Sequence, residues 1–237
     1  MIDDSSRVTA FKWAALLPRL LGVPLWLNHS IKSIAGKQRV ESVDIEDAAG
    51  QVKTVACDGV IFSGRFVAES SLVRLGHLQL DARSGGPVVD QYGRCSDPDY
   101  FACGNLLHPV DTAGWCWSEG RRLAAFVHAD LVGELPQTGR VIDIETSEDN
   151  IRYFTPQRIA LPRSAAEMNL AVGSAPALQM RFKHGSNGCL RLRSDGTTVA
   201  SRKLRARAET RQLLALPLDK LFHCQSLSLE LTGHRGD

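Results

Sequence analysis

The sequence predicts an α/β region over residues 1–140, followed by a small all-β sandwich or barrel over residues 141–237. Two observations lead to this division. Apolar residues recur at helical spacing from Trp115 to Val132, after a stretch in which short strands alternate with turns. From Ile151 onward, apolar residues recur at every second position, which is typical of strands with one buried face.

The charged residues divide near the same place. From Ile151 onward there are 14 Lys and Arg against 6 Asp and Glu, whereas the residues before Ile151 contain 14 against 20. The net charge of +2 therefore hides an acidic half and a basic half. Because apolar spacing and charge change together, we expect a linker within the polar stretch 137–150.

Length and composition limit the classes of protein that fit. A chain of 237 residues with 43% hydrophobic residues can bury one large or two ordinary cores. No run of about eighteen apolar residues predicts a membrane span. Residues 1–9 lack the basic-then-apolar order of a secretory signal, so we expect a cytoplasmic protein. The six cysteines form no C-x-x-C pair and no metal-ligand grouping, which favours separate buried thiols and no metal.

The α/β region reads in order as helix, strand, meander, strand and helix. Gly22 is expected to end the first helix, and Gly36 and Gly50 separate the strands of the meander. The expected elements are a helix over 8–21, a strand over 23–28, an antiparallel meander over 31–35, 40–47 and 52–57, a buried strand over 58–64 and a short helix over 69–76.

The stretch 90–125 has the order of turn, buried strand, glycine-marked loop and long helix. Tyr100–Cys103 is aromatic and then small, which suits a strand buried on both faces. Gly104 ends that strand, and Gly114 lies directly before the predicted helix. A glycine there leaves the first N–H groups of the helix accessible, and the helix dipole adds roughly half a positive charge. We therefore expect an anion, or a ring that becomes anionic on reduction, to bind at this helix N-terminus.

Two segments of this region resemble motifs of the pyridine nucleotide-disulfide oxidoreductase type of flavoprotein, which has two dinucleotide-binding domains. Ala102-Cys103-Gly104-Asn105 is similar to the Ala-x-Gly-Asp sequence that meets the ribitol of FAD, with asparagine in place of aspartate. Residues 57–64 are similar to the strand by which the NAD(P) domain returns to the FAD domain. The most similar subgroup contains opine oxidase and hydrogen cyanide synthase subunits, and the resemblance covers roughly residues 7–135.

The resemblance implies that residues 1–140 are a partial Rossmann-like region, made of the second half of an NAD(P) domain and the C-terminal FAD segment. It implies FAD as the cofactor, with NAD(P) as a second candidate. It directs the helix N-terminus at the pyrimidine side of the isoalloxazine ring, where positive charge favours the reduced flavin. Asn105 can hydrogen-bond a ribitol hydroxyl. The implied cofactor-binding residues are Gly64, Gly104, Asn105, Thr112, Ala113, Gly114 and Trp115, and no catalytic residue is implied.

The chain contains no G-x-G-x-x-G sequence, although such loops cradle the pyrophosphates in this family. It therefore resembles the C-terminal half of a larger flavoenzyme. Either a separate polypeptide carries the N-terminal dinucleotide-binding half, or the chain is a truncated product, and both interpretations stay open. The expected partners are a small-molecule substrate and that polypeptide, and neither nucleic acid nor a membrane is expected.

Several side chains near the predicted helix have two interpretations. His108 lies in the loop that the resemblance brings near the flavin, but a loop histidine is more often solvated than catalytic. Glu119 most simply complements the dipole of the first helical turn, and no partner at a defined spacing indicates acid-base chemistry for it or for Asp111. Trp115 and Trp117 either face the cofactor or only pack the domain.

The β-rich region should contain roughly six to eight short strands. They are expected near 151–153, 178–182, 189–193, 213–216 and 227–231, with turns at 185–188 and 195–196. Many of its arginines alternate with apolar residues, which puts them on one face: Arg181, Arg191, Arg193, Arg202, Arg205, Arg207 and Arg211. A solvated face is the simplest interpretation, ahead of an interface with the acidic first half or an acidic partner. No nucleic-acid-binding motif accompanies them.

Two classes of function follow. The first is an FAD-dependent, NAD(P)-linked oxidoreductase, or a subunit or fragment of one, that transfers hydride between a small organic substrate and flavin. The second is a non-catalytic assembly or binding subunit that retains a remnant flavoprotein fold. The FAD-facing segment favours the first class, and the missing glycine loops favour the second. The substrate has no signature in the sequence.

Overall fold

The computed structural model describes residues 1–6, 8, 16–63, 66–164, 167 and 176–235. The chain forms two compact units, Met1–Arg65 and Phe66–Asp237. The predicted boundary at residues 140 and 141 lies inside the second unit. Gly64, one of the predicted cofactor residues, lies outside the described residues.

The first unit is built around the predicted meander. Its elements are β1 (Ile2–Asp3), α1 (Leu16–Leu20), β2 (Trp26–Leu27), β3 (His29–Ala35), β4 (Ser42–Asp47) and β5 (Val52–Ala56). Strand β4 lies between β3 and β5, and both pairings are antiparallel, which confirms the meander. Val43 and Ile45 of β4 are buried because they lie on one face of the central strand. Residues 9–15 of the helix expected over 8–21 lie outside the described part, and α1 covers Leu16–Leu20 of the remainder.

The buried strand predicted over residues 58–64 is wrong for the part that the structure describes. Residues 58–63 belong to no helix or strand, and Ile61 and Phe62 are 95% and 75% exposed. A strand is stable only when its N–H and C=O groups pair with a neighbouring strand. No strand of the described ranges pairs with this segment, so its apolar side chains stay exposed.

The second unit contains the long helix and the loops that lead to it. Its helical elements are α2 (Ser71–Leu75), the short 3-10 turn η2 (Gly104–Leu106), α3 (Ala113–Leu131) and α4 (Leu218–Leu221). Both predicted helices, near 69–76 and from Trp115, are therefore confirmed. Of the helices described, none has both the length and the apolar character that crossing a bilayer requires.

The strand predicted over Tyr100–Cys103 is wrong. A single isolated bridge joins Phe101 to Arg94, and Tyr100 is 49% exposed. One bridge does not make a ladder, because a strand needs several consecutive paired residues. The segment nevertheless runs through the interior, since Ala102 is buried.

The β-rich region is a sandwich of two sheets, as predicted. Its strands are β6 (Thr138–Glu145), β7 (Ile151–Thr155), β8 (Arg158–Pro162), β9 (Ala177–Phe182), β10 (Ser186–Ser194), β11 (Thr197–Ala206), β12 (Gln212–Ala215) and β13 (Leu227–Arg235). The larger sheet has the order β11-β10-β13-β6-β8, and the smaller has the order β12-β9-β7. Side chains from both sheets form one core, in which Ile159, Leu178 and Leu190 are fully buried.

Two sequence predictions within the sandwich have different outcomes. The predicted turn at Asp195-Gly196 is confirmed, because both residues have positive φ, 48° and 80°, as a two-residue type I′ hairpin requires. The linker predicted over residues 137–150 is wrong in part, because β6 occupies Thr138–Glu145. Ile142 and Ile144 are buried in the core, and Asp143 between them is exposed, as expected for a strand with one buried face.

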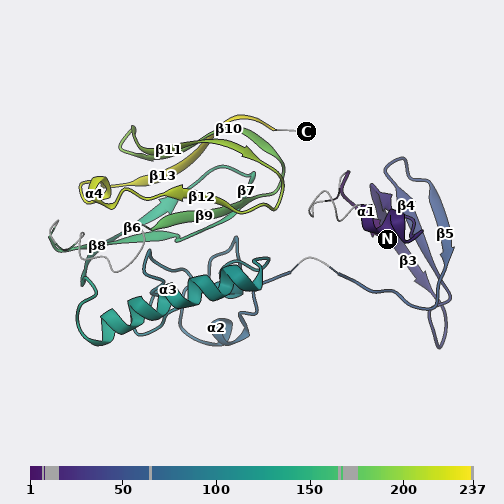
Figure 1. The fold of residues 1–237 in the computed structure, drawn as a ribbon, viewed down its shortest axis with the longest axis horizontal. Coiled ribbons are helices and arrows are strands. Elements are labelled where there is room, and N and C mark those ends of the chain that lie inside the picture. The colour runs from purple at the N-terminus through teal and green to yellow at the C-terminus, as the bar shows by residue number, and fades with distance from the viewer. Residues whose placement is uncertain (7, 9–15, 64–65, 165–166, 168–175, 236–237) are drawn as a thin grey trace. The chain divides into compact units, whose positions relative to one another are not determined.

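The segment before α3 is joined to the sandwich by buried amide side chains. In Figure 1, α3 runs along the sheets of the sandwich. Gln91 donates through Nε2 to the carbonyl of Ala160 at 2.6 Å and accepts the Ala160 N–H at 2.8 Å. Gln157 accepts the Val89 N–H at 3.0 Å, and its own backbone N–H donates to the Val89 carbonyl at 3.2 Å. Satisfied buried hydrogen bonds of this kind hold two segments in one relative position.

We expect limited proteolysis to begin within residues 57–63. Proteinase K, which has a broad sequence preference, should cut first near Phe62, because that residue is 75% exposed and its segment lies outside every described helix and strand. Residues 138–145 should resist, since β6 is paired with both β8 and β13. Mass spectrometry of the fragments over time gives the order of cuts. A first cut within residues 137–150, with residues 57–63 intact, would contradict the observed division into units.

Candidate functional site

The loop before α3 is shaped by two glycines. A Cβ at Gly86 would lie 2.1 Å from the carbonyl oxygen of Leu106, so only glycine lets these two backbone segments approach. Gly104 has a φ of +69°, a left-handed conformation that favours glycine. Together they set the course of η2, the turn that carries Asn105.

The N-terminus of α3 is open to solvent. Thr112, Ala113, Gly114 and Trp115 are all exposed, and Thr112 makes no side-chain capping hydrogen bond. Within the described part of the chain, no group accepts a hydrogen bond from the N–H of Ala113 or Gly114. Free N–H groups and the helix dipole act in the same direction, so this end suits an anion or the polar edge of a ligand.

Asn105 lies beside this opening. Its side chain is exposed, and its Oδ1 accepts the backbone N–H of Asp111 at 3.0 Å. Since no described group accepts a hydrogen bond from its Nδ2, that amide can donate to a ligand. The structure therefore brings together six of the seven predicted cofactor residues, from Gly104 to Trp115, and the seventh is Gly64.

The buried His108 forms a pair with the partly buried Glu119 next to η2. His108 is 1% exposed, and its Nε2 lies 3.3 Å from Oε1 of Glu119. The other carboxylate oxygen accepts the N–H of Gly104 at 2.8 Å. Burial opposes ionisation of Glu119, but the hydrogen bonds from His108 and Gly104 and the charge of Arg122 outweigh it and lower the pKa of this carboxyl.

Two sequence-based interpretations are therefore wrong at this pair. His108 is buried rather than solvated. Glu119 reaches back from α3 to the η2 loop instead of only complementing the dipole of the first turn. Gly104 has a left-handed conformation, and its backbone N–H donates to the carboxylate of Glu119. This hydrogen bond helps to hold η2 in place.

Asp111 anchors the loop to the sandwich. One of its carboxylate oxygens pairs with Arg181 of β9, and the other accepts Nε2 of Gln179 at 2.7 Å. Asp111 and Arg181 are both buried, at 8% and 6% exposed. A solvated arginine face is thus the wrong interpretation for Arg181, which meets the acidic first half of the chain.

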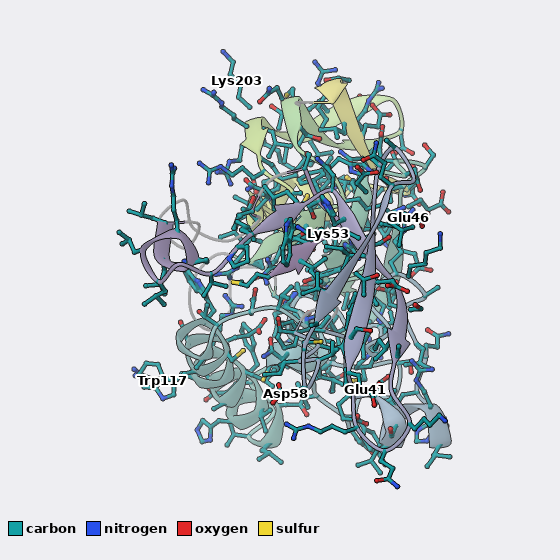
Figure 2. All side chains as sticks on the ribbon, turned by 90° about the vertical axis from the view of Figure 1, so that its right-hand side faces the viewer. Glu41, Glu46, Lys53, Asp58, Trp117 and Lys203 are labelled. Carbon is teal, nitrogen blue, oxygen red and sulfur yellow. The ribbon has the colours of Figure 1, made fainter. Side chains whose placement is uncertain are left out.

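The two tryptophans of α3 lie outside the hydrophobic cores. Trp115 and Trp117 are 51% and 65% exposed, and Figure 2 shows Trp117 projecting outward from the helix. The guanidinium carbon of Arg211 lies 3.9 Å from the centre of the Trp115 ring, and that of Arg121 lies 4.9 Å from the Trp117 ring. Each indole therefore presents a face to a cation, and the packing interpretation is wrong.

A cleft of about 290 Å³ lies between α3 and the smaller sheet. Its lining includes Trp115 and Glu119 of α3, His108 of the preceding loop, and Gln179 and Arg211 from the sandwich. Arg211 Nε donates to Gln179 Oε1 at 2.5 Å. Among the described residues, Trp115 alone belongs both to this lining and to the predicted cofactor set.

The cysteines around the site are poorly suited to act as nucleophiles. All six are free thiols, and only Cys95 and Cys224 are fully buried. Burial raises the pKa of Cys103 and of Cys116, and it raises the pKa of Cys95 to about 11. A thiol with a raised pKa forms little thiolate, so Cys103 lines the cleft as a packing residue.

Sequence reasoning missed the partners that complete the site. Asp111 and Arg181 are 70 residues apart, so no local spacing announces their contact. No local spacing announces the contact of Arg211 either. This residue directly precedes β12 and lies over the ring of Trp115 in the first turn of α3. The opposite charges of the two halves were the one available signal, because they favour contacts between the halves.

Comparisons with known proteins show the fold. No family model matches the sequence, and no curated protein matches it. The chain is similar to thioredoxin reductase of T. acidophilum, with a TM-score of 0.52 and 21% identity over 55% of this chain and 44% of that chain. That likeness shows that part of the chain shares its fold with part of this thioredoxin reductase.

Two further solved structures are less similar. One is the ferredoxin reductase for the CYP199A2 system from Rhodopseudomonas palustris, with a TM-score of 0.47 and 16% identity over 90% of this chain and 49% of that chain. The other is an NAD-dependent persulfide reductase from A. fulgidus, with a TM-score of 0.46 and 13% identity over 84% of this chain and 37% of that chain. The chain thus spans less than half the length of each of these three structures.

We expect Asp111→Asn to lower the free energy of unfolding by about 3–5 kcal/mol, because it leaves the charge of Arg181 buried without its counter-ion. Chemical denaturation followed by circular dichroism measures the loss. The matched control is Glu230→Gln, which breaks the more exposed ion pair with Arg193 and should cost no more than about 1 kcal/mol. Equal, small losses for both variants would show that the buried pair does not hold the loop.

Proposed function

We propose that the chain is part of an FAD-dependent oxidoreductase that works with NAD(P) and transfers hydride between a small organic substrate and flavin. The open N-terminus of α3, next to Gly104 and Asn105, is the observation that carries the proposal. These positions resemble the FAD segment of the opine oxidase and hydrogen cyanide synthase subgroup. The fold shared with part of a thioredoxin reductase supports it.

The residues at this helix end suit FAD. No atom lies within 4 Å of the place where a Cβ of Gly114 would be, so that side of the helix is open. The N–H groups of Ala113 and Gly114 can donate to the polar edge of the isoalloxazine ring, and Nδ2 of Asn105 can donate to a ribitol hydroxyl. FAD bound there supplies the hydride acceptor, and the positive helix end favours its reduced form. Thr112, Trp115 and Gly64 complete the proposed set.

The proposed partner is a second polypeptide that carries the N-terminal dinucleotide-binding half. The beginning of the second unit exposes four large apolar side chains, between 68% and 86% each: Phe66, Val67, Leu72 and Leu75. Exposed apolar residues that gather in one segment mark protein-binding surfaces. We infer that this polypeptide covers the segment around α2.

A non-catalytic assembly or binding subunit is the second candidate. The exposed apolar segment around α2 favours it, because that segment suits assembly whether or not flavin is bound. The two candidates differ in one requirement, since only the oxidoreductase needs FAD at the N-terminus of α3. Flavin binding by this helix end therefore separates them.

We expect the chain alone to purify colourless and to bind added FAD weakly, and Gly114→Asp to weaken that binding roughly tenfold. An aspartate at the helix N-terminus adds a negative charge where an anionic flavin would lie, at a cost of about 1 kcal/mol or more. Quenching of flavin fluorescence gives the dissociation constants. Gly120→Asp is the matched control, because Gly120 lies in the same helix and also has open space around its Cβ position. Equal weakening by both variants would place the flavin elsewhere.

Asn105 provides an independent test of the same site. Asn105→Asp should leave FAD binding unchanged or tighten it, because a carboxylate accepts hydrogen bonds from both the ribitol and the Asp111 N–H. Asn105→Leu should weaken binding, since the ribitol hydroxyl loses its partner. The same fluorescence titration measures both, with circular dichroism to confirm that each variant is folded. Identical dissociation constants for all three proteins would show that residue 105 does not face the cofactor.

A further inference from the structure

The cleft between α3 and the smaller sheet contains polar groups without partners. His108 and Thr155 both line it, and they are 1% and 7% exposed. Nδ1 of His108 and Oγ1 of Thr155 are buried and have no hydrogen-bond partner among the described residues. Buried polar atoms are nearly always satisfied in folded proteins, so both atoms are available to a ligand in the cleft.

Arg211 gives the cleft a positive charge with which no described carboxylate forms an ion pair. In the part of the chain that is described, no carboxylate lies within 4.0 Å of its guanidinium. The group is nevertheless oriented, because its Nε donates to Gln179 and its face lies on the ring of Trp115. Nη1 is buried without a partner, so this edge of the guanidinium is available to an acceptor.

The other charges around the cleft leave this positive charge in excess. Asp90 is paired with Arg94 at 3.0 Å, so it contributes no net charge. Glu119 and Arg122 oppose each other at 3.8 Å, and Glu119 also holds the N–H of Gly104. One unpaired cation therefore remains, which a single negative charge would balance.

The volume and the remaining lining limit the ligand further. At roughly 30 Å³ for each water-sized group, a cleft of about 290 Å³ accommodates about ten non-hydrogen atoms. The rings of Trp115 and Phe126 and the side chain of Leu123 supply apolar surface beside the polar groups. A small body with one apolar face and one anionic end fits both features.

We propose that this cleft binds a small monocarboxylate with an apolar or aromatic body. The carboxylate lies against the free edge of Arg211, whose fork-shaped donors match its two oxygens. The body lies against Trp115 and Leu123, and His108 and Thr155 bond polar substituents. The inference does not rest on the proposed binding of FAD, because the other predicted cofactor residues are absent from the lining.

The test titrates the FAD-free chain with benzoate, which has a carboxylate, an aromatic body and a suitable size. Isothermal calorimetry should show saturable binding of one benzoate per chain. Benzamide has nearly the same shape without the charge, and it should bind about tenfold more weakly or worse. Inorganic phosphate should not displace benzoate, because a dianion would face the carboxylate of Glu119.

Two variants locate the bound benzoate. Arg211→Met should weaken it about tenfold or more, whereas Arg205→Met, which removes an exposed arginine of β11, should leave the affinity unchanged. If Arg211→Met fails to fold, the comparison of benzoate with benzamide on the unmodified chain still tests whether binding requires the carboxylate. Absence of saturation, equal binding of benzamide, unchanged affinity in Arg211→Met, or displacement by phosphate would each overturn the proposal.

Discussion

A buried ion pair between Asp111 and Arg181 ties the loop before α3 to strand β9. Gln179 bonds the second oxygen of the same carboxylate, so the whole group is engaged. Burying two charges costs solvation free energy, and the pair recovers it only when the geometry is good. The loop and the sheet are thereby held in one relative position. Since Asp111 lies two residues before the first residue of α3, this contact also helps to set where the helix begins.

The sandwich is therefore part of the site and not a separate appendage. From Gln179 the contacts continue to Arg211, and from Arg211 to the ring of Trp115 in the first turn of α3. On the other side, Glu119 reaches back along the helix to Gly104. The helix end is thus fixed from two directions, while its first N–H groups stay open. Such an arrangement positions donors before a ligand arrives, which lowers the entropy lost on binding.

The sequence predicts this structure well where the signal is local. The meander around β4, the hairpin at Asp195-Gly196 and helix α3 follow from spacing and turn residues over a few positions. The failures at residues 58–63 and Tyr100–Cys103 have another cause. Apolar character identifies a segment that suits the interior of a sheet, but the pairing strands have to be present as well. The ion pair between Asp111 and Arg181 could not be predicted from local patterns, because its two residues are 70 positions apart.

Strand β13 has a central place in the larger sheet, between β10 and β6, although it follows all the other strands of the sandwich in sequence. It runs antiparallel to β10 and parallel to β6, so it joins two parts of the sheet that do not otherwise pair. During synthesis, the apolar faces of those parts stay uncovered until β13 has left the ribosome. Long-range pairing of this kind is slow and exposes a chain to aggregation. The pairs β10–β11 and β6–β8 can form before β13 is made, but the larger sheet becomes continuous only when β13 joins them.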